Sequence, residues 1–183
     1  MPISLVHAQQ PYPSTWRSYR RPLCHTVPRY WQAWLQDKGS LTQRLVHASN
    51  GQFSVRVVRN QWGIPSASEA KILKLKPRQR AIIREVELLC HGQVWVCARS
   101  IIPHGTLTGR LRRFKNIGDK PLGALLFKHP NMVRGPLQVT CLIQQPSLQQ
   151  HWARRSVFYL DDKGILVTEV FMPPMATISP QDV

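Results

Sequence analysis

The sequence predicts an α+β fold whose core is a single antiparallel β-sheet. Large apolar residues first recur at helical spacing, and from residue 51 onward apolar and polar residues alternate with a period of two. The alternating segments follow one another through short turns, an order typical of antiparallel rather than parallel sheets. The 183 residues suit one domain, and no internal repeat divides them.

Two helices precede the first strand in this prediction. Aromatic and aliphatic residues recur at helical spacing after Pro28, which a first helical turn tolerates, and Gly39 suits the end of that helix. Ser40 then has the position of an N-cap, with Gln43 three residues later as in a capping box. A second short helix is therefore expected over residues 41–48.

The strands are predicted from alternation and from the turns between them. His91–Gly92 and residues 161–164 have compositions that suit tight reversals. Residues 62–79 contain one glycine and two prolines and are predicted to be irregular, whereas residues 121–127 have the pattern of a short buried helix. Strands are expected from residue 53 and over residues 81–89, 94–102, 132–143, 152–160 and 165–172.

The predicted folded domain spans residues 28–175. Residues 1–27 contain four prolines and a cluster of arginines. Because prolines at that density oppose helix and central strand alike, we expect a loosely ordered, basic leader. Residues 176–183 are expected to form a frayed tail.

The charge balance points to an anionic partner. Lys and Arg number 25 and Asp and Glu 9, which gives a net charge of +16. Nucleic acid, anionic lipid and a small dianion all suit such a charge. Aromatic residues make up only 8%, without the interleaving typical of RNA-binding proteins, so nucleic acid is disfavoured. No apolar run reaches about 18 residues and the N-terminus lacks a signal-peptide pattern, so we expect no membrane span.

Motifs for metals, nucleotides and acyl transfer are absent from the sequence. The seven histidines are scattered without HExxH, and neither GxGxxG, GxxxxGK[ST] nor GxSxG occurs. Cys24, Cys90, Cys97 and Cys141 form no CxxC pair and no metal-binding cadence. We therefore expect no metal site and reduced cysteines, the last three being core thiols of a cytoplasmic protein.

Two charged residues interrupt apolar rows in the predicted strands. Arg84 shares its face with Ile82 and Val86, and Glu169 shares its face with Phe171. A charge on an apolar face is costly to bury unless it is paired. Either the two side chains pair with each other or reach the sheet edge, or both line a cavity that receives a polar anionic ligand.

Other basic residues carry weaker indications. Arg99, Arg154 and Arg155 lie on predicted strands, where each suits a solvated face. Because neighbours in a strand point opposite ways, at least one of the adjacent pair Arg154 and Arg155 is expected to be solvated. The basic stretch at residues 110–115 is able to contact phosphates, but we interpret it as a solvated helix face.

Six segments, taken in order, resemble the chorismate pyruvate-lyase family. The likeness spans residues 28–173, and the order and spacing of the set carry it. The segments are WLQDKGSLT at 34–42, REVEL at 84–88, WVCARSIIP at 95–103, GDKPLGALLF at 118–127, WARRS at 152–156 and LVTEVFMP at 166–173.

The resemblance implies an antiparallel sheet with an enclosed ligand cavity under helical flaps, in a monomeric, cytoplasmic enzyme without a cofactor. It implies elimination of pyruvate from chorismate to give 4-hydroxybenzoate, the first step of ubiquinone biosynthesis. Arg84 and Glu169 match the family's binding arginine and glutamate and are expected to be catalytic as well. Leu122 matches the leucine of the family's PLG segment, and Leu41 stands at a flap position that often holds methionine; both are expected to bind substrate.

A second interpretation is kept beside the enzyme. Folds related to this family serve as effector domains of bacterial transcription regulators, so the alternative is a non-catalytic domain that senses an aromatic acid. No helix-turn-helix domain precedes the segments quoted above, and we therefore expect the enzyme rather than the sensor.

Overall fold

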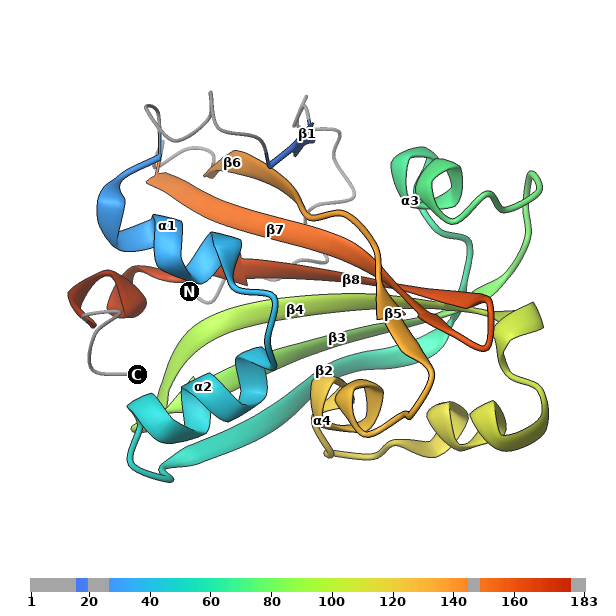
Figure 1. The fold of residues 1–183 in the computed structure, drawn as a ribbon, viewed down its shortest axis with the longest axis horizontal. Helices are drawn as coiled ribbons and strands as arrows, with labels where there is room; N and C mark the ends of the chain where they lie inside the picture. Colours follow the sequence, from blue (N-terminus) through green and yellow to red (C-terminus); the bar gives the residue numbers. More distant parts are fainter. Residues whose placement is uncertain (1–15, 20–26, 145–148, 179–183) are drawn as a thin grey trace.

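The computed structural model describes residues 16–19, 27–144 and 149–178, which form one eight-stranded antiparallel sheet with helices packed against it (Figure 1). This confirms the predicted α+β class. The short strand β5 (Met132–Arg134) pairs with β7 beside the main row. That row runs β1 (Arg17–Ser18), β6 (Gln138–Gln144), β7 (Gln149–Leu160), β8 (Lys163–Phe171), β4 (Gln93–Pro103), β3 (Ala81–Cys90) and β2 (Phe53–Gly63).

Two-residue turns close the β3–β4 hairpin and the β7–β8 hairpin. His91 and Gly92 join β3 to β4 with φ of 51° and 73°, and Asp161 and Asp162 join β7 to β8 with φ of 46° and 64°. Positive φ at both positions suits a type I′ turn, whose twist matches that of the flanking strands. Both predicted reversals are therefore confirmed, the second one as a turn of two residues.

The two N-terminal helices lie over one face of the sheet (Figure 1). The Oγ atom of Ser40 accepts a hydrogen bond from the backbone N–H of Gln43 at 3.4 Å, so the predicted N-cap starts the second helix. The first helix ends before Gly39 because Asp37 is extended, with φ −58° and ψ 123°. These helices are α1 (Arg29–Gln36) and α2 (Leu41–Ala48).

The sheet face that carries Arg84, Val86 and Leu88 is called the front face below. Trp34 of α1 and Leu45 of α2 are fully buried and pack with Val86 and Leu88 in one apolar cluster on this face. A second cluster on the same sheet buries side chains of the segments that follow β4. Those segments are the 3-10 turns η3 (His104–Thr106) and η4 (Gly109–Asn116) and the predicted short helix α4 (Leu122–Phe127), and a further 3-10 turn, η5 (Pro173–Thr177), follows β8.

The opposite, back face is covered in part by a helix that the sequence prediction missed. Helix α3 (Ala67–Ile72) lies within residues 62–79, which were predicted to be irregular. A complete capping box starts it: Glu69 N–H donates to Ser66 Oγ, and Ser66 N–H donates to the Glu69 carboxylate. Ile72 then packs on the back face of the sheet. The Ser66–Glu69 spacing is a cap signal in the sequence, but the prediction of an irregular segment rested on its glycine and two prolines alone.

The strand predicted at residues 132–143 is two strands. β5 and β6 pair with successive parts of β7, and the chain between them contains Gly135 and Pro136. Pro136 has no N–H to donate to a ladder, which explains the interruption. Gly135 N–H donates to the carbonyl of Val157 at 2.8 Å and holds the crossing against β7.

The predicted leader and tail fall largely outside the described residues. Within the leader, Arg17 pairs with Val139 of β6, and Val27 is buried in the front-face core. Among the cysteines, Cys90 and Cys97 are buried thiols, as predicted, whereas Cys141 is only half-buried. Burial and the nearby Glu87 raise the pKa of Cys97 to about 12, which makes its thiol inert. Cys24 and residues 179–183 lie outside the described ranges.

Candidate functional site

A cavity lies between the front face and the helices over it. The space between protein atoms there is about 540 Å³, a volume that includes space open to solvent at the mouth. Strands β3, β4, β7 and β8 supply its floor, and the first turns of α2 and α4 and the end of β5 supply its walls. All four residues predicted for the site, Arg84, Glu169, Leu41 and Leu122, line this one cavity.

Arg84 reaches the cavity as a buried guanidinium without a contacting carboxylate. Its side chain is on β3, where strand alternation turns it to the front face, and the residue is 1% exposed. Nη2 donates to the carbonyl of Lys120 at 3.1 Å, while Nε and Nη1 have no hydrogen-bond partner among the described residues. Burial lowers the pKa of Arg84, and Asp119 partly offsets this. The group is therefore a cation with two nitrogens that are able to donate hydrogen bonds to a ligand.

Glu169 reaches the same cavity from β8. It pairs with Arg154 rather than Arg84, and neither β8 nor β3 is an edge strand, so the first of the two alternatives left open above does not hold. Its Oε2 accepts a hydrogen bond from Nε of Arg154 at 2.5 Å, and its side chain is 13% exposed. The carboxylate is thus oriented by one guanidinium and faces the cavity that another lines.

Leu41 and Leu122 are the first residues of α2 and α4 and are both buried. The two helix starts meet closely over the cavity. A Cβ atom at Gly123 would lie 3.2 Å from Oγ1 of Thr42, so glycine is what permits this approach. Residues in a first helical turn have N–H groups without an intrahelical acceptor, and both leucines stand at such positions.

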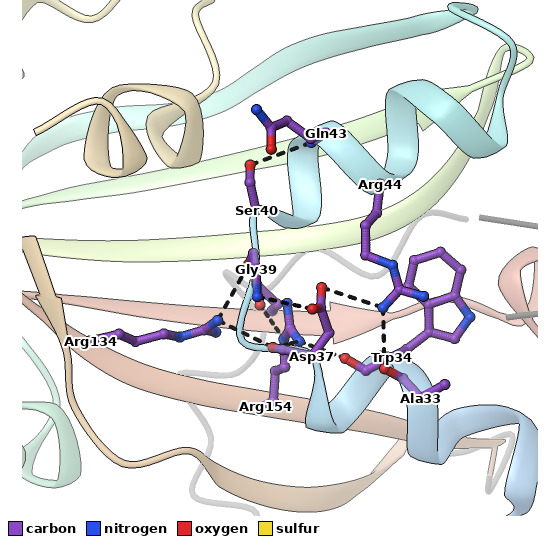
Figure 2. Close-up of polar contacts among 10 residues, drawn as sticks. Ala33, Trp34, Asp37, Gly39, Ser40, Gln43, Arg44, Arg134 and Arg154 are labelled. Atoms are coloured by element: carbon purple, nitrogen blue, oxygen red, sulfur yellow. Dashed lines mark hydrogen bonds and ion pairs between the residues drawn. The ribbon is translucent and has the colours of Figure 1, made fainter.

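Two more arginines tie the turn between α1 and α2 to the sheet (Figure 2). Arg154 Nη1 donates to the carbonyls of Trp34 and Asp37 at 2.5 and 2.8 Å. Arg134 Nη1 donates to the carbonyls of Asp37 and Gly39 at 3.2 and 3.5 Å. The backbone that leads into α2, and hence into the cavity wall, is held by guanidiniums from β7 and β5.

Arg134 lines the cavity and was not among the residues predicted for the site. Its Nε donates to Oγ of Ser156 at 2.9 Å, and its guanidinium lies over the ring of Phe158 at 4.9 Å. Burial, together with repulsion from Arg154, lowers the pKa of Arg134 to about 10. In the sequence it is one basic residue in a three-residue strand, too short for alternation to assign it a face.

The expectation that Arg154 or Arg155 is solvated is wrong. Arg154 is 0% and Arg155 7% exposed, on opposite faces of the sheet. Arg155 donates to Ser68 and Gln138 on the back face. Strand alternation predicts that the two side chains point opposite ways, but it does not predict solvation. Here α1 covers Arg154, and Trp16 and α3 cover Arg155.

Arg99 is likewise not solvated, since its side chain is only 14% exposed. It lies on the back face, where it forms ion pairs with Glu69 of α3 and Glu85 of β3. Burial alone would lower the pKa of Arg99, but the two carboxylates outweigh it and raise the pKa. The back-face arginines are thus compensated within the fold and do not line the cavity. The basic stretch at residues 110–115 has exposed charged side chains, as predicted.

The described ranges contain no group of three or more His, Cys, Asp and Glu side chains that is able to hold a metal ion. No helix there has the length and apolar character needed to cross a membrane.

Solved structures with a similar fold define the class of the protein. The chain is similar to PhnF from Mycobacterium smegmatis, with a TM-score of 0.56 and 12% identity over 76% of this chain and 66% of that one. It is also similar to a GntR-family transcriptional regulator from Bacillus cereus, with a TM-score of 0.52 and 9% identity over 67% of this chain and 93% of that one. The class is an α+β domain with one open antiparallel sheet, here with a cationic cavity under helices.

Sequence comparisons narrow this class to one family. The family model for chorismate lyase matches residues 14–179. A probable chorismate pyruvate-lyase from Marinobacter nauticus is 40% identical over 83% of this chain and 79% of its own length. Another from Aromatoleum aromaticum is 36% identical over 90% of this chain and 95% of its own length. The chain belongs to the chorismate lyase family, and it is an enzyme of the lyase class.

Proposed function

We propose that this chain is a chorismate pyruvate-lyase, which eliminates pyruvate from chorismate and leaves 4-hydroxybenzoate as the first step of ubiquinone biosynthesis. The observation that carries the proposal is one cavity, in a chain of this family, that presents both Arg84 and Glu169. A monomeric state and a cytoplasmic location belong to the same proposal.

Arg84 is assigned to the ring carboxylate of the substrate. A guanidinium keeps its charge at all working pH values and binds a carboxylate through two parallel hydrogen bonds. Nε and Nη1 of Arg84 have no partner among the described residues, and the second N–H of Nη2, whose first is bonded to the carbonyl of Lys120, completes the parallel pair with one of them. The N–H groups of Leu41 and Leu122 add donors from the cavity wall.

Glu169 is assigned to the ring hydroxyl that becomes the phenol. During the reaction the ether bond between the ring and the enolpyruvyl oxygen breaks, and its electron pair stays on that oxygen. The neighbouring hydroxyl-bearing ring carbon loses its proton, the ring becomes aromatic, and the enolpyruvate takes up a proton to form pyruvate. The carboxylate of Glu169, fixed by Arg154, accepts a hydrogen bond from the hydroxyl and holds the ring in the reactive orientation.

Closure of the cavity supports this chemistry. Helix starts at Leu41 and Leu122 restrict access, and a water-poor cavity strengthens each contact of a charged group with the substrate. Release of the product then requires these walls to move, so we expect product release to be slow.

The proposal is tested by incubating the purified chain with chorismate and measuring pyruvate and 4-hydroxybenzoate together. We expect equal amounts of both from the unaltered chain. Arg84→Ala should lower kcat/KM by about 10²-fold or more, because a preorganised charge contact is removed. The exposed Arg113, changed to alanine, is the control and should stay within about twofold, as surface substitutions do.

Three results would count against the proposal. One is release of 3-hydroxybenzoate, which requires a different arrangement of groups around the ring. Another is unchanged turnover by a folded Arg84→Ala variant, with folding checked by circular dichroism and thermal melting. The third is binding of 4-hydroxybenzoate without turnover of chorismate, which is the behaviour of a sensing domain.

A further inference from the structure

The front-face cavity has a surplus of positive charge. The guanidiniums of Arg84 and Arg134 line it with one carboxylate, that of Glu169, and Arg154 contacts this carboxylate from outside the lining. Arg154 and Glu169 form an ion pair and neutralise each other. Neither Arg84 nor Arg134 forms an ion pair with any described residue. Two positive charges therefore remain without a contacting counter-ion in a buried site.

Arg134 is bonded only to neutral acceptors. Its Nε donates to the hydroxyl of Ser156, and its Nη1 donates to the carbonyls of Asp37 and Gly39. The carboxylate of Asp37 is engaged elsewhere, by Arg44 at 3.3 Å and by the N–H of Gly39 at 2.9 Å. A half-buried cation without a contacting carboxylate is costly, and the lowered pKa of Arg134 agrees with that cost.

The sheet register places the two unpaired arginines on opposite sides of the cavity floor. Arg84 on β3 is opposite Ser100 on β4, which is opposite Val167 on β8, which is opposite Ser156 on β7. Directly opposed residues point to the same face, so this row forms part of the floor. Arg134, on β5 beyond β7, donates to Ser156 at the far end of the row. Two cations thus flank one cavity from its two sides.

We propose that Arg134 binds the second carboxylate of a dicarboxylate substrate, the one on the enolpyruvyl group, while Arg84 binds the carboxylate on the ring. The inference rests on the proposed function and deepens it, because it assigns one cationic residue to each half of the substrate. A substrate with two carboxylates supplies the two negative charges that the cavity lacks. The aromatic product keeps only the ring carboxylate, so it satisfies Arg84 and leaves Arg134 unpaired.

This difference between substrate and product gives the test. We expect Arg134→Gln to lower kcat/KM for chorismate by about 30-fold or more, while the Kd for 4-hydroxybenzoate changes by less than about threefold. Arg84→Gln should weaken both, since both ligands carry the ring carboxylate. Arg134→Lys keeps the charge without the forked geometry and should recover part of the lost kcat/KM. Titration calorimetry gives the Kd, and pyruvate release gives kcat/KM.

A matched control separates substrate binding from support of the turn. Arg44→Gln removes a contact with the same Asp37 from the outer side, without removing a cation from the cavity. We expect Arg44→Gln to lower Tm without a selective loss of kcat/KM. Equal weakening of substrate and product by Arg134→Gln would overturn the inference, and so would no effect on either. If Arg134→Gln fails to fold, the same comparison is made with Arg134→Lys.

The two proposals fail in different ways. If the unaltered chain does not convert chorismate, the proposed function is wrong. If it does convert chorismate and the Arg134 variants keep full kcat/KM, the proposed function stands and the role of Arg134 is wrong.

Discussion

Arg154 connects the acidic residue of the cavity to the helices above it. Its guanidinium is fully buried and bonds at once to Glu169 and to the carbonyls of Trp34 and Asp37. The guanidinium also lies 5.5 Å from the ring centroid of Phe171. Its donors are spread over a rigid plane, so Nε serves the carboxylate while Nη1 serves the two carbonyls. The position of Glu169 and the position of the α1–α2 turn are therefore linked through one side chain.

The first prediction concerns the stability that this residue supplies. Arg154→Gln should lower the free energy of unfolding by about 3–5 kcal/mol, because it leaves the carboxylate of Glu169 half-buried without its partner. Urea denaturation at pH 7 measures this as a lower midpoint with an unchanged slope.

The cause of that loss is checked with a double-mutant cycle. Adding Glu169→Gln to Arg154→Gln removes the unpaired negative charge of Glu169 and should recover part of the lost free energy of unfolding. The exposed Arg113, changed to glutamine, should cost no more than about 0.5 kcal/mol. A loss of the same size in the single and double variants would show that the charge of Glu169 is not the reason.

Residue-level prediction from sequence worked where a charge interrupts a long apolar row. Arg84 and Glu169 stand in strands of nine or ten residues, so alternation alone turned them toward the core. Arg134 ends a strand of three residues, and its partner Asp37 is 97 positions away in the chain. Its place in the cavity is a result of tertiary contacts that no local pattern contains.

At the scale of elements, an ion pair between Glu69 and Arg99 attaches α3 to the back face of the sheet. Glu69 stands inside its first turn, accepts from Arg99 Nε at 2.7 Å and from the N–H of Ser66 at 2.8 Å, and is 7% exposed. Burial by itself would raise the pKa of Glu69, but its hydrogen bonds and the charge of Arg99 outweigh burial and lower it below the usual 4.5. The cap of α3 and its attachment to the sheet therefore depend on the same ionised carboxylate.

The second prediction is a pH dependence that follows from this lowered pKa. Folded Glu69 binds fewer protons than unfolded Glu69 near pH 4.5, so its stabilisation is complete above that pH and is lost as the pH falls through the folded pKa. Glu69→Gln keeps a capping amide but not the charge and should cost about 1–3 kcal/mol at pH 7. Urea titrations from pH 7 to pH 3 should show the gap to the unaltered chain narrowing. A gap that stays constant with pH would contradict the prediction.

Elements were predictable where local signals agreed with one another. The N-cap Ser40 and the turns at His91–Gly92 and Asp161–Asp162 each fix a boundary by backbone geometry, and the structure places them as expected. The prediction failed where signals conflicted, as with the capping box of Ser66 next to Pro65. Such conflicts are decided by packing, here of Ile72 against the back face, which sequence periodicity does not reveal.

At the scale of the whole molecule, the two faces of the sheet differ in whether their arginines are paired with carboxylates. On the back face, Arg99 is compensated by two carboxylates inside the fold. On the front face, Arg84 and Arg134 keep uncompensated charge beside a cavity. Around both lies a chain with a net charge of +16, of which the exposed arginines of η4 are one part. The net charge of the chain and the charge of the cavity are thus both positive, opposite to the charge of a dicarboxylate substrate.

The third prediction tests this agreement by ionic strength. Raising KCl from 20 to 500 mM should raise KM for chorismate several-fold while kcat changes by less than about twofold, because salt screens exposed charges but not groups inside the closed cavity. A variant with Arg110, Arg112 and Arg113 changed to glutamine should have a higher KM at 20 mM KCl and a smaller response to salt. Since these side chains are exposed on η4 and do not line the cavity, its kcat should be unchanged. A KM that is flat in salt would mean that the surface charge plays no part in substrate capture and that the arginines inside the cavity supply the attraction alone.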